Sequence, residues 1–158
     1  MTMSQSTLLP RIIPATAKKR ESALWSEFRN QAKKLRPKWI LTLIETRLTP
    51  GIPDVLLCDE QGTFHFIELK YTTSNVVALS PHQVSWLTKH SHSHSWILVR
   101  RGDRRGKGDR ETFLYPASEA MDLRMEGLVR DPLFHCDKEV PWATIFDVIS
   151  DSVFNAIV

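Results

Sequence analysis

Apolar residues recur at helical spacing near the start of the chain. Leu24, Phe28 and Leu35 lie four and seven residues apart with no Gly or Pro between them, a spacing typical of one face of a helix. Pro37 follows shortly afterwards and ends the predicted helix, because proline cannot continue one. The residues before the helix, 1–17, are rich in Pro, Ser and Thr and are predicted to form a flexible tail.

Beyond this helix, short runs of apolar and β-branched residues bounded by Gly, Pro and Asp are typical of strands. Strands are predicted over Trp39–Ile44, Asp54–Cys58, Thr63–Tyr71, Ser95–Arg100 and Thr112–Tyr115. Further helices are predicted to open at Ser80-Pro81, with Ser as the N-cap, and to cover Ser118–Arg124 and Pro141–Phe154. This order of elements predicts an α/β domain with a mixed β-sheet flanked by helices.

The length and composition suit one domain. The chain has 158 residues, of which 42% are hydrophobic, and this is enough to form a packed core and to exclude wholesale disorder. The domain is predicted to span residues 18–158, with a C-terminal helical extension after the last predicted strand. The net charge of +3 is compatible with a polyanionic partner without requiring one.

The compartment is predicted from the apolar runs and the cysteines. No run of about 18 apolar residues occurs, so no membrane-spanning helix is predicted. Cys58 and Cys136 lie in apolar surroundings and are too few for a disulfide framework or a cysteine zinc site. We therefore expect a cytoplasmic protein with both thiols reduced.

Charged residues on two neighbouring strands are the strongest candidates for chemistry. Asp54 opens the second predicted strand, and Glu68 and Lys70 lie two positions apart on the third, so the last two share one face of the sheet. Two carboxylates held close together are costly to bury unless they are paired or bind a metal. Oxygen ligands of this kind favour Mg²⁺ over zinc.

The turn between these strands determines whether the carboxylates meet. If residues 60–62 form a three-residue loop with Gly62 in the left-handed conformation, the register places Asp54 directly opposite Glu68. A four-residue loop would place Asp54 opposite Ile67 instead and would separate the carboxylates. The alternative interpretation is that Asp54 caps a turn while Glu68 and Lys70 form a surface ion pair.

Three sequence stretches carry a resemblance to a known family. Pro53-Asp54 followed by Glu68-Leu69-Lys70 resembles the PD-(D/E)xK motif of restriction-like nucleases. The segments 51–55 and 79–87 are similar to VRR-type nucleases and archaeal-type Holliday-junction resolvases, including small phage-encoded relatives. The resemblance covers about residues 20–100 and implies a restriction-endonuclease-like fold.

The resemblance implies a set of catalytic residues, namely Glu21, Asp54, Glu68, Lys70 and Gln83. In such families an acid on the first helix completes the site, and Glu27 and Glu45 are alternatives to Glu21 for that position. Mg²⁺, for which Mn²⁺ would substitute, is expected on Asp54, Glu68, the Leu69 carbonyl and Glu21. Lys70, expected at the open rim of the sheet, would orient water or stabilise anionic charge, and Gln83 would position Lys70 or the phosphate.

The expected activity is hydrolysis of DNA phosphodiester bonds by an endonuclease, acting on branched DNA such as a Holliday junction or nicking DNA during phage replication or recombination. The alternative is a catalytically silent nucleic-acid-binding or assembly module of the same fold. An RNA substrate and the oligomeric state stay open, although symmetric cutting of a junction would favour a homodimer.

A basic segment with several glycines follows the fourth predicted strand. Its cations are Arg100, Arg101, Arg104, Arg105, Lys107 and Arg110. A solvated hairpin tip is the simpler interpretation. Beside a nuclease site, a loop that binds DNA phosphates is the better hypothesis.

Overall fold

The computed structural model describes residues 15–46, 48–103, 108 and 110–151. The strands are β1 (Ile40–Leu43), β2 (Val55–Cys58), β3 (Phe64–Thr72), β4 (Ser95–Arg101), β5 (Glu111–Pro116) and β6 (Phe134–Asp137). The α-helices are α1 (Ala15–Leu35), α2 (Pro81–Lys89), α3 (Ala120–Glu126) and α4 (Trp142–Ser150), with short 3₁₀ turns at Ala117–Glu119 and Gly127–Val129. No described helix is long and apolar enough to cross a membrane.

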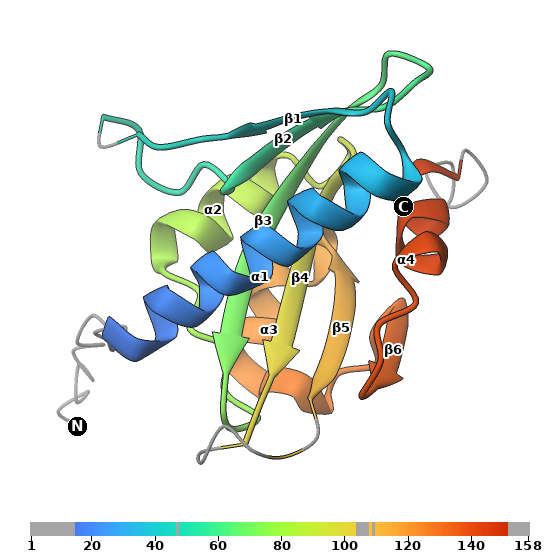
Figure 1. Ribbon diagram of the computed structural model, residues 1–158. Coiled ribbons are helices and arrows are strands. Elements are labelled where there is room, and N and C mark those ends of the chain that lie inside the picture. The colour runs from blue at the N-terminus through green and yellow to red at the C-terminus, as the bar shows by residue number, and fades with distance from the viewer. Residues whose placement is uncertain (1–14, 47, 104–107, 109, 152–158) are drawn as a thin grey trace, which may run out of the picture.

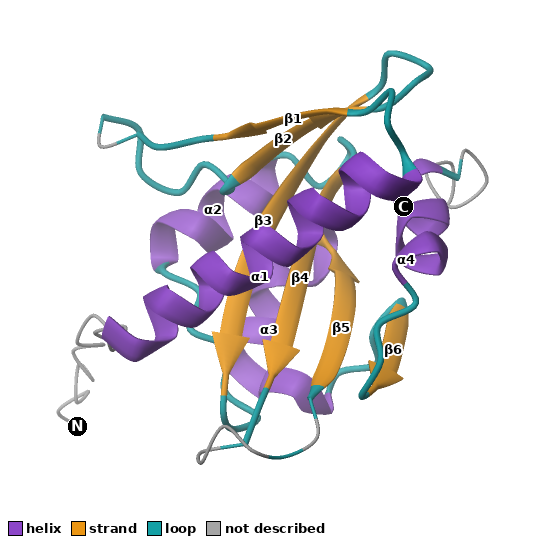
Figure 2. Ribbon diagram, viewed as in Figure 1, coloured by secondary structure: helices purple, strands orange, loops and turns teal. Residues whose placement is uncertain are grey.

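All described strands belong to one mixed sheet with the spatial order β1-β2-β3-β4-β5-β6. The β3–β4 pair is parallel, and the other neighbouring pairs are antiparallel. Figure 1 shows α1 in front of the sheet and α2 and α3 behind it, and Figure 2 shows the same layers by type of element. The predicted mixed sheet flanked by helices is therefore confirmed at the level of an α/β fold.

Alternation along the strands separates two cores. Leu69 of β3 packs in a cluster with Leu24 and Phe28 of α1 and with residues of α4. On the opposite face, Val99 of β4 packs in a cluster with Leu87 of α2 and with residues of α3. Because successive side chains of a strand point to opposite faces, even-numbered residues of β3 lie on the α2 side.

The predicted start of α2 is confirmed. Ser80 is the N-cap and Pro81 occupies the first turn. The Ser80 hydroxyl accepts the Gln83 N–H at 3.1 Å, and Gln83 Oε1 accepts the Ser80 N–H at 2.9 Å. This reciprocal capping box holds the Gln83 side chain against the first turn of the helix.

The predicted register of the β2–β3 hairpin is also confirmed. Gly62 has φ +80° and donates its N–H to the Asp59 carbonyl at 3.0 Å. Val55 pairs with Ile67, so Asp54, one residue earlier, continues the same register toward Glu68. The hairpin loop therefore brings the two candidate carboxylates to neighbouring positions.

A buried histidine and aspartate hold the same hairpin. Asp59 Oδ1 accepts the N–H groups of Gln61 and Thr63 at 2.9 and 3.0 Å, and Asp59 Oδ2 lies 2.9 Å from His65 Nε2. Trp96 Nε1 donates to His65 Nδ1 at 3.3 Å, so Nδ1 is the unprotonated nitrogen and Nε2 carries the hydrogen donated to Asp59. Burial lowers the pKa of His65 and favours this neutral form.

Four details differ from the sequence prediction. Helix α1 begins at Ala15, within the predicted tail, because Ala15 and Ala17 favour helix. Strand β6 was not predicted, because it has only four residues, two of them His135 and Asp137. The C-terminal part is therefore not purely helical. The predicted last helix ends at Ser150, and residues 152–158 lie outside the described part.

Two glycines with positive φ provide a matched test of the fold. Gly51 has φ +91°, and an added Cβ would overlap the backbone carbonyl of His82 in α2, whereas Gly62 has open space around it. Gly62→Ala is expected to lower the free energy of unfolding by about 1–2 kcal/mol from backbone strain alone. Gly51→Ala should cost more, because it adds a collision with α2. Urea unfolding of both variants measures the difference, and equal losses would contradict the close packing of the loop on α2.

Candidate active site

The candidate site lies where β3 extends past the end of β2. The pairing of β2 with β3 ends at Val55 and Ile67, while β3 continues to Thr72. Asp54 Oδ2 accepts the next N–H on this edge, that of Leu69, at 2.9 Å. The Glu21 carboxylate of α1 accepts the N–H group of Tyr71, two residues further along this edge. Two carboxylates thus replace the missing strand partner.

Glu68 and Lys70 occupy the α2 side of the same stretch of β3. Glu68 is 1% exposed, and its Oε1 accepts the Gln83 amide at 2.6 Å and lies 3.2 Å from Lys70 Nζ. Since Gln83 Oε1 is already bound to the Ser80 N–H, only its NH₂ group can face Glu68. The capping box of α2 therefore determines which atom of Gln83 reaches the site.

Both donors converge on one oxygen of Glu68 and leave the other unused. Glu68 Oε2 is buried and has no hydrogen-bond partner among the described residues. Burial and, next, the charge of Asp54 raise the pKa of Glu68 to about 8. Burial also raises the pKa of Asp54 and of Glu21. The environment therefore disfavours three negative charges in the absence of a compensating cation.

This donor set suits a divalent cation. The Lys70 ammonium group acts on all three carboxylates, those of Glu21, Asp54 and Glu68, while Lys18 has a smaller effect on Glu21. The buried Glu68 Oε2 atom has no partner among the described residues. The Leu69 carbonyl adds a further oxygen, because the N–H and C=O of one residue point to the same side of a strand. Hard cations such as Mg²⁺ prefer oxygen ligands of this kind. The arrangement can thus hold a metal and place a cation, Lys70, beside it.

The expected exposure of Lys70 needs correction, and the structure shows which group Gln83 contacts. Lys70 was expected at an open rim, but it is 3% exposed and paired with Glu68, because β4 and α2 cover this face of β3. For Gln83, which was expected to position Lys70 or a phosphate, the structure shows a contact to Glu68 Oε1, the same oxygen that lies against Lys70.

The structure separates Glu21 from the alternative acids. The charges of Lys70 and Asp54 both influence the pKa of Glu21. Glu27 instead binds the Arg100 guanidinium and accepts the Trp142 N–H at 3.2 Å. Glu45 is exposed in the segment after β1. Glu21 is therefore the helix acid that joins the cluster.

The predicted DNA-binding residues fall in different environments. Arg104, Arg105 and Lys107 lie outside the described residues, and Arg110 is exposed. Arg100 and Arg101 belong to β4 rather than to a loop. Arg100 is 4% exposed and bound to Glu27, and Arg101 pairs with Glu111 at 2.5 Å. The pairing of Arg101 with Glu111 extends the two strands by one residue each beyond the predicted Ser95–Arg100 and Thr112–Tyr115.

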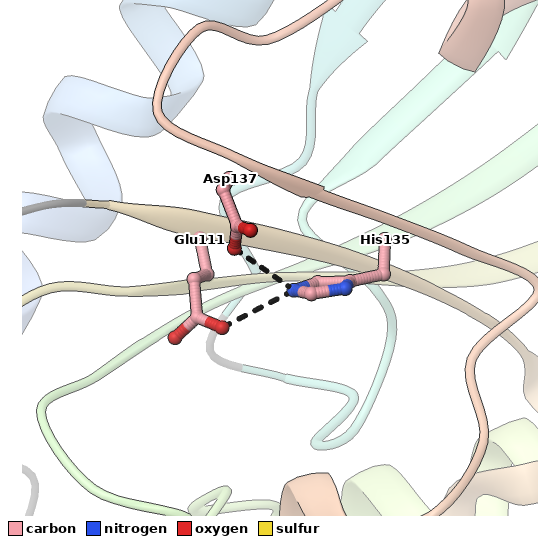
Figure 3. Close-up of side chains that lie close together, drawn as sticks. All are labelled: Glu111, His135 and Asp137. Atoms are coloured by element: carbon pink, nitrogen blue, oxygen red, sulfur yellow. Dashed lines mark hydrogen bonds and ion pairs between the residues drawn. The ribbon is translucent and has the colours of Figure 1, made fainter.

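A second cluster of potential metal ligands was not predicted. Glu111 of β5 and His135 and Asp137 of β6 bring one ligand atom each to within 4.8 Å of one another (Figure 3). His135 Nε2 lies 3.2 Å from Glu111 and 3.5 Å from Asp137, while Arg101 holds the other Glu111 oxygen. This cluster is a closed ion-pair network. A His-x-Asp spacing on a strand is its only sequence signal.

The second cluster is separate from the candidate active site. His135 lies in one cross-strand row with Lys70, connected through Val99 and Phe113. Three strand spacings of about 4.8 Å put these two positions roughly 14 Å apart. The Glu111 network therefore does not supply ligands to the cluster around Glu68.

Comparisons with known proteins add no information about this site. No family model, no curated protein and no solved structure matched the chain. The functional interpretation therefore depends on the geometry of the residues themselves.

The raised pKa of Glu68 predicts how the stability of the metal-free protein depends on pH. Between the ordinary value near 4.5 and the folded value of about 8, the folded state binds more protons than the unfolded state, so this contribution to stability is lost as pH rises. Glu68→Gln removes the titrating group. Its free energy of unfolding should fall less than that of the wild type between about pH 5 and pH 8.

Urea unfolding in a chelator measures this difference. Glu60→Gln, which changes an exposed acid in the β2–β3 turn, is the matched control and should follow the wild type. A Glu68→Gln profile parallel to the wild-type profile would show that Glu68 titrates normally.

Proposed function

We propose that this protein is a Mg²⁺-dependent endonuclease that hydrolyses DNA phosphodiester bonds on a restriction-endonuclease-like fold. One observation carries the proposal: the buried Glu68–Lys70 pair lies beside Asp54, within the electrostatic reach of Glu21, and one buried carboxylate oxygen, Glu68 Oε2, has no partner among the described residues. An ordinary structural ion pair does not need the additional acids Glu21 and Asp54 beside it.

The order of the elements supports the same proposal. The acid on α1, the Asp before β2, the Glu-x-Lys of β3 and the Gln of α2 follow one another as in the PD-(D/E)xK motif that the sequence resembles. The Gln83 contact to Glu68 at 2.6 Å connects the last of these to the cluster. The geometry is therefore compatible with the residues that the resemblance implies.

Each residue has a distinct task in the proposed reaction. Asp54, Glu68, the Leu69 carbonyl and Glu21 would hold Mg²⁺, which polarises a phosphate and lowers the pKa of a bound water. Lys70 supplies a fixed positive charge for the charge that develops on the reacting phosphate. Gln83 holds Glu68 Oε1 and so leaves Oε2 as the oxygen without a partner among the described residues. Because Glu68 and Lys70 are buried and hold each other in place, their side chains need to rearrange little during the proposed reaction.

The proposed substrate is branched DNA such as a Holliday junction, with nicking of duplex DNA as the other mode. Labelled junction, flap, duplex and single-stranded substrates, incubated with Mg²⁺, test this directly. Preferential cutting of junctions with two symmetric cuts would also support a homodimer. Cutting of RNA alone would contradict the choice of substrate.

Metal binding is expected to depend on Asp54. Asp54→Asn removes one of the anionic ligands and should weaken Mg²⁺ and Mn²⁺ binding by at least about 10-fold, a loss typical of altered metal sites. Isothermal titration calorimetry on the wild type and the variant measures this change. Asp122→Asn, at an exposed position of α3, is the control, and equal affinities in all three proteins would contradict the metal site.

Lys70 is expected to affect cleavage much more than binding. Lys70→Met keeps the buried alkyl chain and removes the charge, and Glu68 can then accept a proton, so the fold should persist. Single-turnover cleavage should fall by about 10²–10³, as for the loss of a preorganised charge at a reacting group. DNA affinity in Ca²⁺, which is expected to bind with little turnover, should change only slightly, because one contact is a small part of the electrostatic total.

Lys89→Met, at an exposed position near the end of α2, is the matched control and should retain cleavage. If the wild type and both variants show the same residual cleavage on every substrate, the protein is not a nuclease. Binding of DNA without cleavage would then favour the silent nucleic-acid-binding module.

A further inference from the structure

A cavity of about 450 Å³ lies on the α1 side of the sheet, next to the candidate active site. Arg20 and Ala23 of α1 form one wall, and Tyr71, Arg100 and Gly102 at the ends of β3 and β4 form the floor. Its size is within the range of small-molecule sites, about 300–1,000 Å³. Figure 1 shows α1 crossing in front of these two strands.

The charge lining this cavity is strongly positive. Arg20, Arg100 and Arg110 all contribute to it, and Asp103 is the acid among its described lining residues. A second cavity of about 350 Å³ shares Arg100 and Arg110, but Glu27 and Glu139 also line that one. The first cavity is therefore the better site for an anion.

Arg100 has an unused donor at a buried position. The residue is 4% exposed, and its Nε atom has no hydrogen-bond partner among the described residues, although its NH1 group binds Glu27. A buried cationic donor without an acceptor is costly. Because Arg100 also lines the cavity, an anion bound there would place negative charge close to this donor.

Tyr71 is held so that its hydroxyl can donate. The Arg20 guanidinium lies 5.1 Å from the centre of the Tyr71 ring and donates to the hydroxyl oxygen. The hydroxyl hydrogen is then available to a ligand. A Cβ at position 102 would overlap this hydroxyl, so Gly102 gives Tyr71 its place in the cavity floor.

The cavity and the candidate active site share one end of β3. Tyr71 follows Lys70, and their side chains lie on opposite faces of the strand. The Tyr71 N–H binds Glu21, which is the neighbour of Arg20 on α1. A nucleic-acid strand with one phosphate at the carboxylate cluster would therefore bring another phosphate near these arginines.

We propose that this cavity binds a phosphate group of the nucleic-acid substrate through Arg20, Arg100, Arg110 and the Tyr71 hydroxyl. The nature of the ligand rests on the proposed nuclease function, whereas the preference for an anion rests on the cavity alone. Arginine suits this task, because its planar group presents paired donors to phosphate oxygens. The phosphate comes from either a strand end or the interior of the backbone.

Binding in a chelator tests the proposal without metal or cleavage. The probes are inorganic phosphate and a labelled single strand of about eight nucleotides, a length typical of single-strand sites, with and without a terminal phosphate. Arg20→Gln and Arg110→Gln each remove one charge from the cavity. Lys34→Gln removes one charge from the exposed last turn of α1 and is the matched control.

Each arginine variant should weaken phosphate and oligonucleotide binding by about 10-fold, the equivalent of one charge-assisted hydrogen bond. Each should also reduce the slope of log affinity against log salt concentration by about one. Lys34→Gln should change the affinity by less than about 2-fold. If the terminal phosphate raises the affinity of the wild type for the oligonucleotide, and the arginine variants lose this increase, the ligand is a strand end. Equal weakening of both oligonucleotides identifies an internal phosphate.

Two outcomes separate this inference from the proposed function. If Arg20→Gln and Arg110→Gln bind as well as Lys34→Gln, the phosphate site is wrong even if the wild type cuts DNA. If phosphate binding depends on both arginines but the wild type cuts no substrate, the nuclease proposal is wrong and the anion site stands. Circular dichroism of each variant confirms that the comparison is between folded proteins.

Discussion

The turn between β2 and β3 determines which side chains meet at the edge of β3. Gly62 in the left-handed region closes a three-residue loop, and Asp59 binds two N–H groups of the turn together with His65. A slip of one residue would turn the side chains of β2 to the opposite faces. Asp54 would then face Ile67, and the carboxylate cluster would be lost. The chemistry proposed here therefore depends on a turn whose own residues take no part in it.

Burial makes the charges of Glu68 and Lys70 energetically unfavourable and also strengthens the interactions between them. Glu68 and Lys70 lie among residues that exclude water, so their charges interact strongly and each unsatisfied atom is expensive. The two unsatisfied charged atoms of the described residues are Glu68 Oε2, an acceptor, and Arg100 Nε, a donor. Glu68 lies in the middle of β3 on the side of α2, and Arg100 lies near the end of β4 on the side of α1. A cation would compensate Glu68 Oε2, and an anion would compensate Arg100 Nε. In the proposed reaction, a metal ion would supply the first charge and a phosphodiester the second.

The sequence predicted the features that depend on near neighbours. The Ser80-Pro81 helix start and the Gly62 loop are local signals, and the loop alone was sufficient to place Asp54 opposite Glu68. Contacts between distant segments could not be predicted in this way. The binding of Arg100 by Glu27 and the burial of Lys70 depend on how α1, α2 and β4 cover β3. Strand β6 was missed because its pairing with β5, rather than its own composition, makes it a strand.

The two carboxylates that accept N–H groups of β3 have a further consequence for how the protein behaves in solution. Past Ile67 the strand presents N–H groups that another chain could pair with, and such an open edge is a site of aggregation. Glu21 and Asp54 occupy these N–H groups with acceptors from their side chains and add negative charge along the edge. A second strand would have to displace both. The groups assigned to metal binding thus also keep neighbouring molecules from joining their sheets at this edge.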